Sequence, residues 1–549
     1  MTSPVTPWHW LAAAAPVLVL LALVTTGRVK TRTASLIVAG LTLLLAATVF
    51  GSGALTLGVA LGKGLWLGAW ILYVVFPAML LYRIAERAGF DRIGALFDHL
   101  FPKRSENLLV LAWLLPSFVQ GVAGFGTPIA VAAPLLAASG WAKHRAVAYP
   151  LIGYHWSVTF GSMGSSYYMA ALTAHLGGAD SAAFAHHASF LLGVNCLVAG
   201  ALVLMLDGGL RGLREGGPLL LIAGVPMAVT LYAVTSAVPA VGSVAAGAVG
   251  FVAALGLSMV TRRRQGAKAG RQPGVTSVGA AEATQACEPV VGQSGEVSPR
   301  QSRRRAALLV SPYLYLLGVA LLVLLVPPSR HWVDAHVAFG PSFPGTSTSS
   351  GWQTPAVSGY TPLRLFSHPG TYLLLACGLG YLTYRRAGLW RRRPVRELAR
   401  AWWSSVHSTA VSIVALACVT TVLIEAGMVS TLARGAVAAT GSGFPALSGL
   451  IGALGSFLTG STTSSNALFS ALQAEVAGLL HAPESVLLAA QTAGANVGNS
   501  LAPVVILIGI AAVGGGVQTY RVLRMVAAAA VVLLAVVTGL TLLMAQMTT

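Results

Sequence analysis

Long apolar stretches separated by short polar ones run along nearly the whole chain. The first covers residues 8–26, is too long for a signal-peptide core, and is followed by Arg28, Lys30 and Arg32, so we expect a retained span. Further apolar stretches cover residues 34–50, 65–82, 108–116, 146–172, 189–206, 218–236, 241–260, 306–326, 371–384, 406–423, 444–458, 486–513 and 525–544. A helix needs about 20 residues to cross the hydrocarbon core. The pattern predicts an all-α polytopic integral membrane protein with about 12–14 transmembrane helices.

Two polar segments interrupt this pattern. Residues 261–305 begin TRRRQGAKAGRQPG and end SPRQSRRR, which predicts a flexible basic linker between a membrane half of residues 1–260 and one of residues 306–549. Residues 329–368 are rich in Ser, Gly, Pro, Trp and His. Because one apolar stretch separates the two segments, we expect them on opposite sides of the membrane.

Composition agrees with a protein embedded in lipid. Of 549 residues, 56% are hydrophobic and only 9% are charged, which excludes a soluble fold. The formal net charge of +19 comes from 34 Lys and Arg against 15 Asp and Glu. With the N-terminus outside, all the basic residues except Lys63, Arg330, Arg364 and Arg434 fall on one face, as expected for cytoplasmic loops. The basic excess therefore gives no support to nucleic-acid binding.

The four cysteines predict no cofactor or metal site. They are far apart, with no CxxC motif and no histidine at ligand spacing. We therefore expect neither a disulfide framework nor a bound metal.

Two stretches are apolar enough for the membrane but rich in Gly, Ser and Thr. They are residues 117–128 (SFVQGVAGFGTP) and 456–466 (SFLTGSTTSSN). Each is followed by a second such patch, at residues 154–166 (YHWSVTFGSMGSS) and 492–503 (TAGANVGNSLAP). The matching order predicts two pseudo-repeats, each with a broken or re-entrant segment.

Such segments are typical of a substrate site. Broken backbone at membrane depth is tolerated where it lines a polar cavity, and half-helix N-termini there present N–H groups to an anion. The alternative is that the small residues only allow close helix packing. The expected binding residues are Gln120, Gly121, Gly124, Gly126, Thr127, Gly460, Ser461, Thr462, Thr463, Ser464, Ser465, Asn466, Asn496, Asn499 and Ser500.

At these residues the chain resembles the L-lactate permease family of bacteria. The similar segments are FVQGVAGFGTP at 118–128, FLTGSTTSSNALFSALQ at 457–473 and TAGANVGNSLAP at 492–503. The resemblance implies a proton-coupled symporter of the cytoplasmic membrane for lactate, glycolate and similar 2-hydroxy monocarboxylates, with inverted repeats. It also implies a departure, because Gln120, Thr462 and Asn499 stand where the family has Glu, Asp and Lys. Another organic anion as cargo, or sodium as the coupling ion, therefore remains an alternative.

Other groups would have to carry a coupled proton. His155 lies in a Gly-rich patch and titrates near neutral pH, although a buried structural histidine is an equal alternative. Glu425 ends an apolar stretch and is either an intramembrane carboxylate or an interfacial charge. For Arg434 and Lys63, an interfacial position is the favoured interpretation.

Other function classes find little support. Residues 455–462 have P-loop glycine spacing but lack its lysine, so ATP-driven transport is not indicated. Ser162 or Ser165 with His155 is a possible hydrolase pair, but no motif accompanies it. A passive anion channel is the closer rival to a carrier, since Gly and Thr loops also form selectivity filters.

Overall fold

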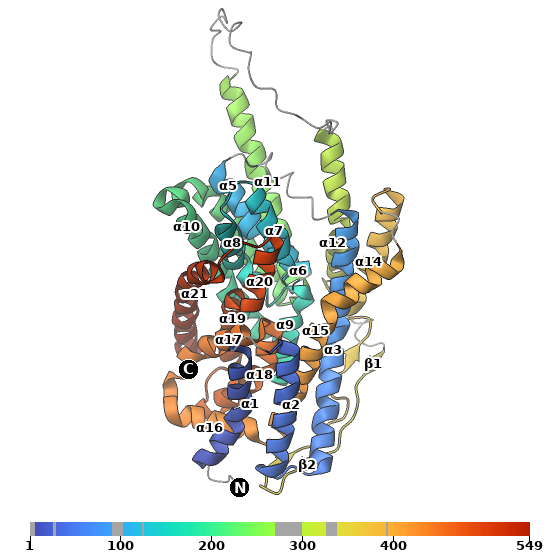
Figure 1. The fold of residues 1–549 in the computed structure, drawn as a ribbon, viewed down its shortest axis with the longest axis vertical. Coiled ribbons are helices and arrows are strands. Elements are labelled where there is room, and N and C mark those ends of the chain that lie inside the picture. The colour runs from blue at the N-terminus through green and yellow to red at the C-terminus, as the bar shows by residue number, and fades with distance from the viewer. Residues whose placement is uncertain are drawn as a thin grey trace, which may run out of the picture.

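The chain forms an almost entirely helical membrane protein in a computed structural model (Figure 1). The structure describes residues 6–25, 29–89, 101, 103–122, 124, 126–269, 299–325, 337–390 and 394–548. The elements up to residue 325 are α1 (Pro7–Thr25), α2 (Thr31–Thr48), α3 (Ala54–Ala88), α5 (Arg104–Leu109), η2 (Val110–Leu114), α6 (Leu115–Val122), α7 (Thr127–Ala138), α8 (Lys143–Tyr154), η3 (His155–Ser157), η4 (Ser162–Gly164), α9 (Ser165–Thr173), α10 (Gly178–Thr235), η5 (Pro239–Val241), α11 (Gly242–Ala269) and α12 (Pro299–Leu325).

The remaining elements include four strands of two residues each. They are β1 (Ala338–Phe339), β2 (Thr346–Ser347), β3 (Gln353–Thr354), β4 (Leu363–Arg364), α14 (Pro369–Arg386), α15 (Val395–Glu425), α16 (Met428–Thr440), η6 (Gly441–Gly443), α17 (Pro445–Thr459), α18 (Thr462–Leu480), α19 (Glu484–Leu501), α20 (Pro503–Ala512) and α21 (Thr519–Thr548). Strand β1 pairs antiparallel with β4, and β2 pairs antiparallel with β3.

The all-α membrane fold is confirmed, but the apolar stretches do not map one to one onto helices. Among the described residues, 6 helices are long and apolar enough to cross a membrane, and the pair α19 and α20, bent by 46°, makes up to 7. The predicted spans 189–206 and 218–236 both lie in α10, which turns at Gly209. The predicted span 146–172 is divided among α8, η3, η4 and α9. Large apolar side chains such as Val252 and Val531 are about 70% exposed, as expected for lipid-facing helices.

Described parts of the two polar segments lie toward opposite ends of the molecule. Helices α11 and α12 extend from one end of the bundle, whereas β2 lies near the other (Figure 1). The two helices include residues 261–269 and 299–305 of the predicted linker. The rest of that linker, residues 270–298, lies outside the described residues.

Glycines allow two pairs of helices to approach closely. A Cβ on Gly494 of α19 would lie 1.8 Å from the Gly449 carbonyl oxygen of α17, and a Cβ on Gly498 would lie 2.0 Å from that of Ala453. A Cβ on Gly64 of α3 would lie 2.5 Å from the Cα of Cys418 in α15. These contacts fix α19 against α17 and α3 against α15, and both pairs carry residues of the site described below.

Candidate functional site

The first Gly-rich segment is a helix break. Helix α6 ends at Val122, and α7 begins at Thr127 after Gly124 and Gly126, whose φ angles are 55° and 82°. A Cβ on Gly124 would lie 1.8 Å from the Ser162 Oγ. Glycine is required here both by the left-handed backbone and by the approach of η4.

The second segment breaks in the same way between α17 and α18. Gly460 has a φ of 68° and ends α17, and Ser461 is the N-cap of α18. The Ser461 Oγ accepts a hydrogen bond from the Ser464 backbone N–H at 3.3 Å. This N-cap explains why a new helix begins directly after the break.

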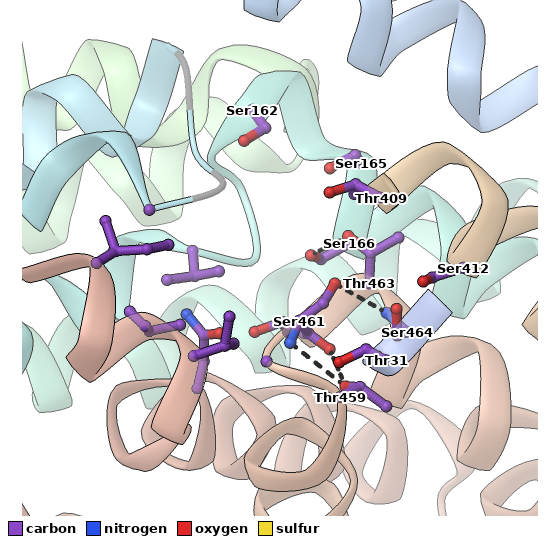
Figure 2. A pocket seen from close by; sticks show the side chains of 18 of the residues that line it. Thr31, Ser162, Ser165, Ser166, Thr409, Ser412, Thr459, Ser461, Thr463 and Ser464 are labelled. Carbon is purple, nitrogen blue, oxygen red and sulfur yellow. Dashed lines mark hydrogen bonds between the residues drawn. The ribbon is translucent and has the colours of Figure 1, made fainter. Parts of the chain in front are cut away.

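Both breaks open onto one cavity of about 170 Å³. Figure 2 shows hydroxyl groups from distant parts of the chain gathered around it, among them those of Thr31, Ser166 and Thr463. The lining residues are Thr31, Gln120, Gly126, Val158, Ser162, Ser165, Ser166, Ser408, Thr409, Ser412, Thr459, Gly460, Ser461, Thr462, Thr463, Ser464, Asn499, Val504, Val505 and Ile508. The two halves of the sequence therefore build one site.

Helix N-termini converge on this cavity. Among the described residues, five helices begin at its lining: α2, α7, α9, α18 and α20. None has an acidic residue in its first turn, and only α18 has a side-chain cap. Some first-turn N–H groups are already bonded, since those of Thr127, Ser165 and Tyr167 donate to the carbonyls of Gly124, Ser162 and Thr159. Each helix start nevertheless carries a partial positive charge. The cavity is thus suited to an anion.

The side chains of the described residues that line the cavity are uncharged. Its polar groups are hydroxyls and the amides of Gln120 and Asn499. The Asn499 Oδ1 is buried and has no hydrogen-bond partner within the described part of the chain. Any charge complementarity to an anion must therefore come from backbone dipoles.

The comparisons with known proteins point to one family. The family model for L-lactate permease matches residues 9–548. The chain belongs to the L-lactate permease family. It is 28% identical over 464 residues to the L-lactate permease of Escherichia coli, covering 82% of this chain and 79% of that protein. It is 27% identical over 470 residues to the glycolate permease GlcA of the same organism, covering 83% and 81%.

Solved structures match this chain only at low similarity. The YdaH transporter of Alcanivorax borkumensis matches with a TM-score of 0.45 and 14% identity, over 89% of this chain and 86% of that one. Membership of the L-lactate permease family makes this protein a multi-pass membrane transporter and not an enzyme.

The three positions at which the sequence resemblance implied a departure from the family pattern share one location. Gln120, Thr462 and Asn499, which are 342 and 37 residues apart along the chain, all line the cavity. Gly126, Gly460, Ser461, Thr463 and Ser464 line it as well. All eight are residues that the sequence predicted for the site.

The other predicted residues lie beside the cavity without lining it. Gly121 and Gly124 allow close packing, and Thr127 is the first residue of α7. The Ser465 Oγ donates to the Gly452 carbonyl at 2.9 Å, and the Ser500 Oγ donates to the Leu151 carbonyl at 2.7 Å. These groups hold the broken segments in place.

Two predicted asparagines belong to a buried network that joins the halves. The Asn466 Nδ2 donates to the Ser166 carbonyl at 2.8 Å and to the Thr492 Oγ1 at 2.9 Å. The Asn496 Oδ1 accepts from the Thr159 Oγ1 at 2.9 Å. Since both side chains are fully buried, their amides position α18 and α19 against the 154–166 segment.

Several lining residues were not predicted. Thr31 starts α2, and Ser408, Thr409 and Ser412 lie in α15, where single hydroxyls among apolar residues give no distinct signal. The Ser412 Oγ also donates to the Ser408 carbonyl, the local bond that a helix-buried serine commonly makes. Ser162, Ser165 and Ser166 also line the cavity. They lie in the Gly-rich patch of residues 154–166, and this patch could have indicated them.

The two candidates for proton coupling lie away from the cavity lining. His155 is fully buried in η3, and its Nδ1 is 2.8 Å from the Ile152 carbonyl oxygen. The Glu425 Oε1 is 2.5 Å from the Lys63 Nζ, with both side chains buried. From the sequence, an interfacial position was the favoured interpretation of Lys63. In the structure its side chain is buried and pairs with Glu425.

Proposed function

We propose that this permease imports L-lactate, glycolate or a related small 2-hydroxy monocarboxylate together with a cation, most simply a proton. The observation that carries the proposal is the convergence of five helix N-termini on one uncharged, hydroxyl-lined cavity. Free N–H groups at helix starts bind carboxylates without a cationic side chain. The names of the related lactate and glycolate permeases support the substrate class.

The cavity has the size and the donors for such an anion. At about 170 Å³ it is smaller than the pockets of drug-sized ligands, which are about 300–1,000 Å³. We assign the carboxylate to the starts of α9 and α18, where the hydroxyls of Ser165, Ser166, Thr463 and Ser464 add donors. We assign the 2-hydroxyl to the amides of Gln120 or Asn499. The unpartnered Asn499 Oδ1 can accept a hydrogen bond from that hydroxyl.

We place proton coupling outside the cavity lining, because none of the described residues that line the cavity is ionisable. His155 and Glu425 are the candidates. We further propose that the N-terminus lies outside, which places the basic loops in the cytoplasm.

Uptake by proteoliposomes tests the proposal. Labelled lactate, glycolate and pyruvate are supplied while a pH gradient and a sodium gradient are imposed separately. We expect lactate and glycolate to accumulate under an inward proton gradient and not under sodium alone. Accumulation driven only by the sodium gradient would show that sodium, and not a proton, is the coupling ion. Uptake of none of the three acids would overturn the proposed substrate class.

Counterflow separates a carrier from a channel. Unlabelled lactate inside the vesicles should accelerate entry of labelled lactate, because a carrier exchanges one for the other. Entry that is unaffected by internal lactate would indicate a passive channel.

A further inference from the structure

Lys63 and Glu425 form a buried ion pair between two long helices. Their side chains are 5% and 2% exposed, and the Lys63 Nζ is 2.5 Å from the Glu425 Oε1. Among the ion pairs of the described residues, this is the one in which both side chains are less than a tenth exposed. It joins α3 to the last residue of α15. An ionisable pair inside a transporter is expensive and points to a role in transport.

The segment of residues 337–368 covers this pair. The Thr346 Oγ1 donates a hydrogen bond of 2.6 Å to the second carboxylate oxygen, Glu425 Oε2. The Lys63 Nζ lies 5.5 Å from the centre of the Tyr360 ring and 5.9 Å from that of Phe343. The carboxylate and the ammonium are thus both bound by the same segment.

The same segment is tied to α3 on either side of Lys63. The Thr56 Oγ1 donates to the Ser347 carbonyl, and the Trp66 Nε1 donates to the Thr361 carbonyl, each at 3.0 Å. Losing the ion pair would therefore loosen a contact among α3, α15 and residues 337–368.

Helix α15 links this contact to the cavity. Ser408, Thr409 and Ser412 of α15 line the cavity, and Glu425 is about 20 Å further along the helix. Between them, the Thr420 Oγ1 donates to the Ala467 carbonyl of α18, and the Thr421 Oγ1 donates to the Ala60 carbonyl of α3 at 2.7 Å. A shift of α15 against α3 would thus reach both the cavity lining and the helix that begins at Thr462.

The charge state of Glu425 decides whether the contact is stable. Its carboxylate lies at the C-terminal end of α15, in direct contact with Lys63 and Thr346. Among the described residues, the titratable groups that face it are Lys63 from α3, Tyr360 from the covering segment and His175 after α9. Protonation of Glu425 would leave Lys63 as a buried cation without a partner, which strongly destabilises a buried pair.

We propose that Lys63, Glu425 and Thr346 form the proton-dependent latch of this transporter. Uptake of a proton by Glu425 breaks the ion pair, releases residues 337–368 and allows α15 to move against α3, which changes access to the cavity. This inference rests on the proposed function in one respect, that the coupling ion is a proton. It assigns Lys63 and Thr346, beside Glu425, to coupling.

Glu425→Gln tests the latch, because the amide mimics the protonated acid. We expect E425Q to keep lactate counterflow. Its accumulation of lactate under a pH gradient should be at least about tenfold lower than that of the wild type. Its exchange rate should no longer change between mildly acidic and neutral pH. Wild-type accumulation and pH dependence in E425Q would overturn the proposal.

Two further variants guard against a folding defect. The double variant K63M/E425Q removes both charges and leaves no unpaired ion, so it should fold and show the same uncoupled exchange. The control pair R211Q/E215Q removes an exposed ion pair of α10 and should transport as the wild type does. Coupled transport by K63M/E425Q would also overturn the latch.

Hydrogen–deuterium exchange separates the latch from the proposed substrate. Without any substrate, backbone amides of residues 343–360 should exchange about tenfold faster in E425Q and in T346V than in the wild type. Equal protection in all three proteins would contradict the latch even if lactate is transported. Faster exchange in a protein that transports no lactate would leave the latch standing and remove the substrate assignment.

Discussion

Individual side chains give this cavity its neutral character. Gln120, Thr462 and Asn499 are uncharged and come from three separate helices, yet they face the same space. We propose that a site built this way holds an anion by oriented N–H groups and hydroxyls, so that its affinity depends on the absence of negative charge.

Gln120→Glu should weaken substrate binding sharply. The exchange keeps the side-chain shape but places a carboxylate in the cavity lining. At about 6 Å and an effective dielectric constant of about 20, repulsion between it and a bound carboxylate is about 3 kcal/mol. We expect the KM for lactate uptake to rise at least about tenfold at neutral pH. The control Q353E adds the same charge on exposed β3 and should leave the KM unchanged. An unaltered KM in Q120E would place the substrate elsewhere.

His155→Ala distinguishes a structural histidine from a proton carrier. The ring is fully buried, bonds to the Ile152 carbonyl and does not line the cavity. We therefore expect H155A to lower stability by about 1–3 kcal/mol while proton-driven accumulation of lactate per folded molecule persists. Loss of the pH-driven part of uptake with counterflow intact would instead assign the coupling step to His155.

At the level of elements, the sequence predicted the helix breaks better than the packing. The breaks at Gly124 to Gly126 and at Gly460 occur where Gly and Ser residues cluster. Gly494 and Gly498 looked similar in the sequence, but they lie inside the continuous helix α19, which bends only after Leu501. A glycine that breaks a helix and one that lets two helices touch give the same sequence signal, and the partner helix decides between them.

Gly494→Ala should therefore destabilise the protein. The added methyl group would meet the Gly449 carbonyl, and neither backbone can yield without separating α17 from α19. We expect a loss of about 1–3 kcal/mol, seen as a lower melting temperature in detergent. The control is G539A, in the middle of α21, where the methyl group meets open space and should leave stability equal or slightly higher. A G494A protein as stable as G539A would show that the two helices are less tightly packed than described.

At the scale of the whole molecule, the long-range pairings were beyond the sequence. The motifs predicted one site from two halves, and eight of the predicted binding residues line the cavity. The contribution of α15 to that lining and the pairing of Lys63 with Glu425, 362 residues away, follow from how α3 and α15 pack. A single sequence does not show which of two charged residues this far apart along the chain form a pair.

The central claim is that the helix N-termini around this cavity bind the carboxylate of a small 2-hydroxy acid. Cryo-electron microscopy of the purified permease at saturating L-lactate tests it most directly. We expect added density in the cavity, with its carboxylate within hydrogen-bond distance of the first turns of α9 and α18, and no such density in Q120E under the same conditions. Lactate bound at another position, with the cavity unchanged, would contradict the account.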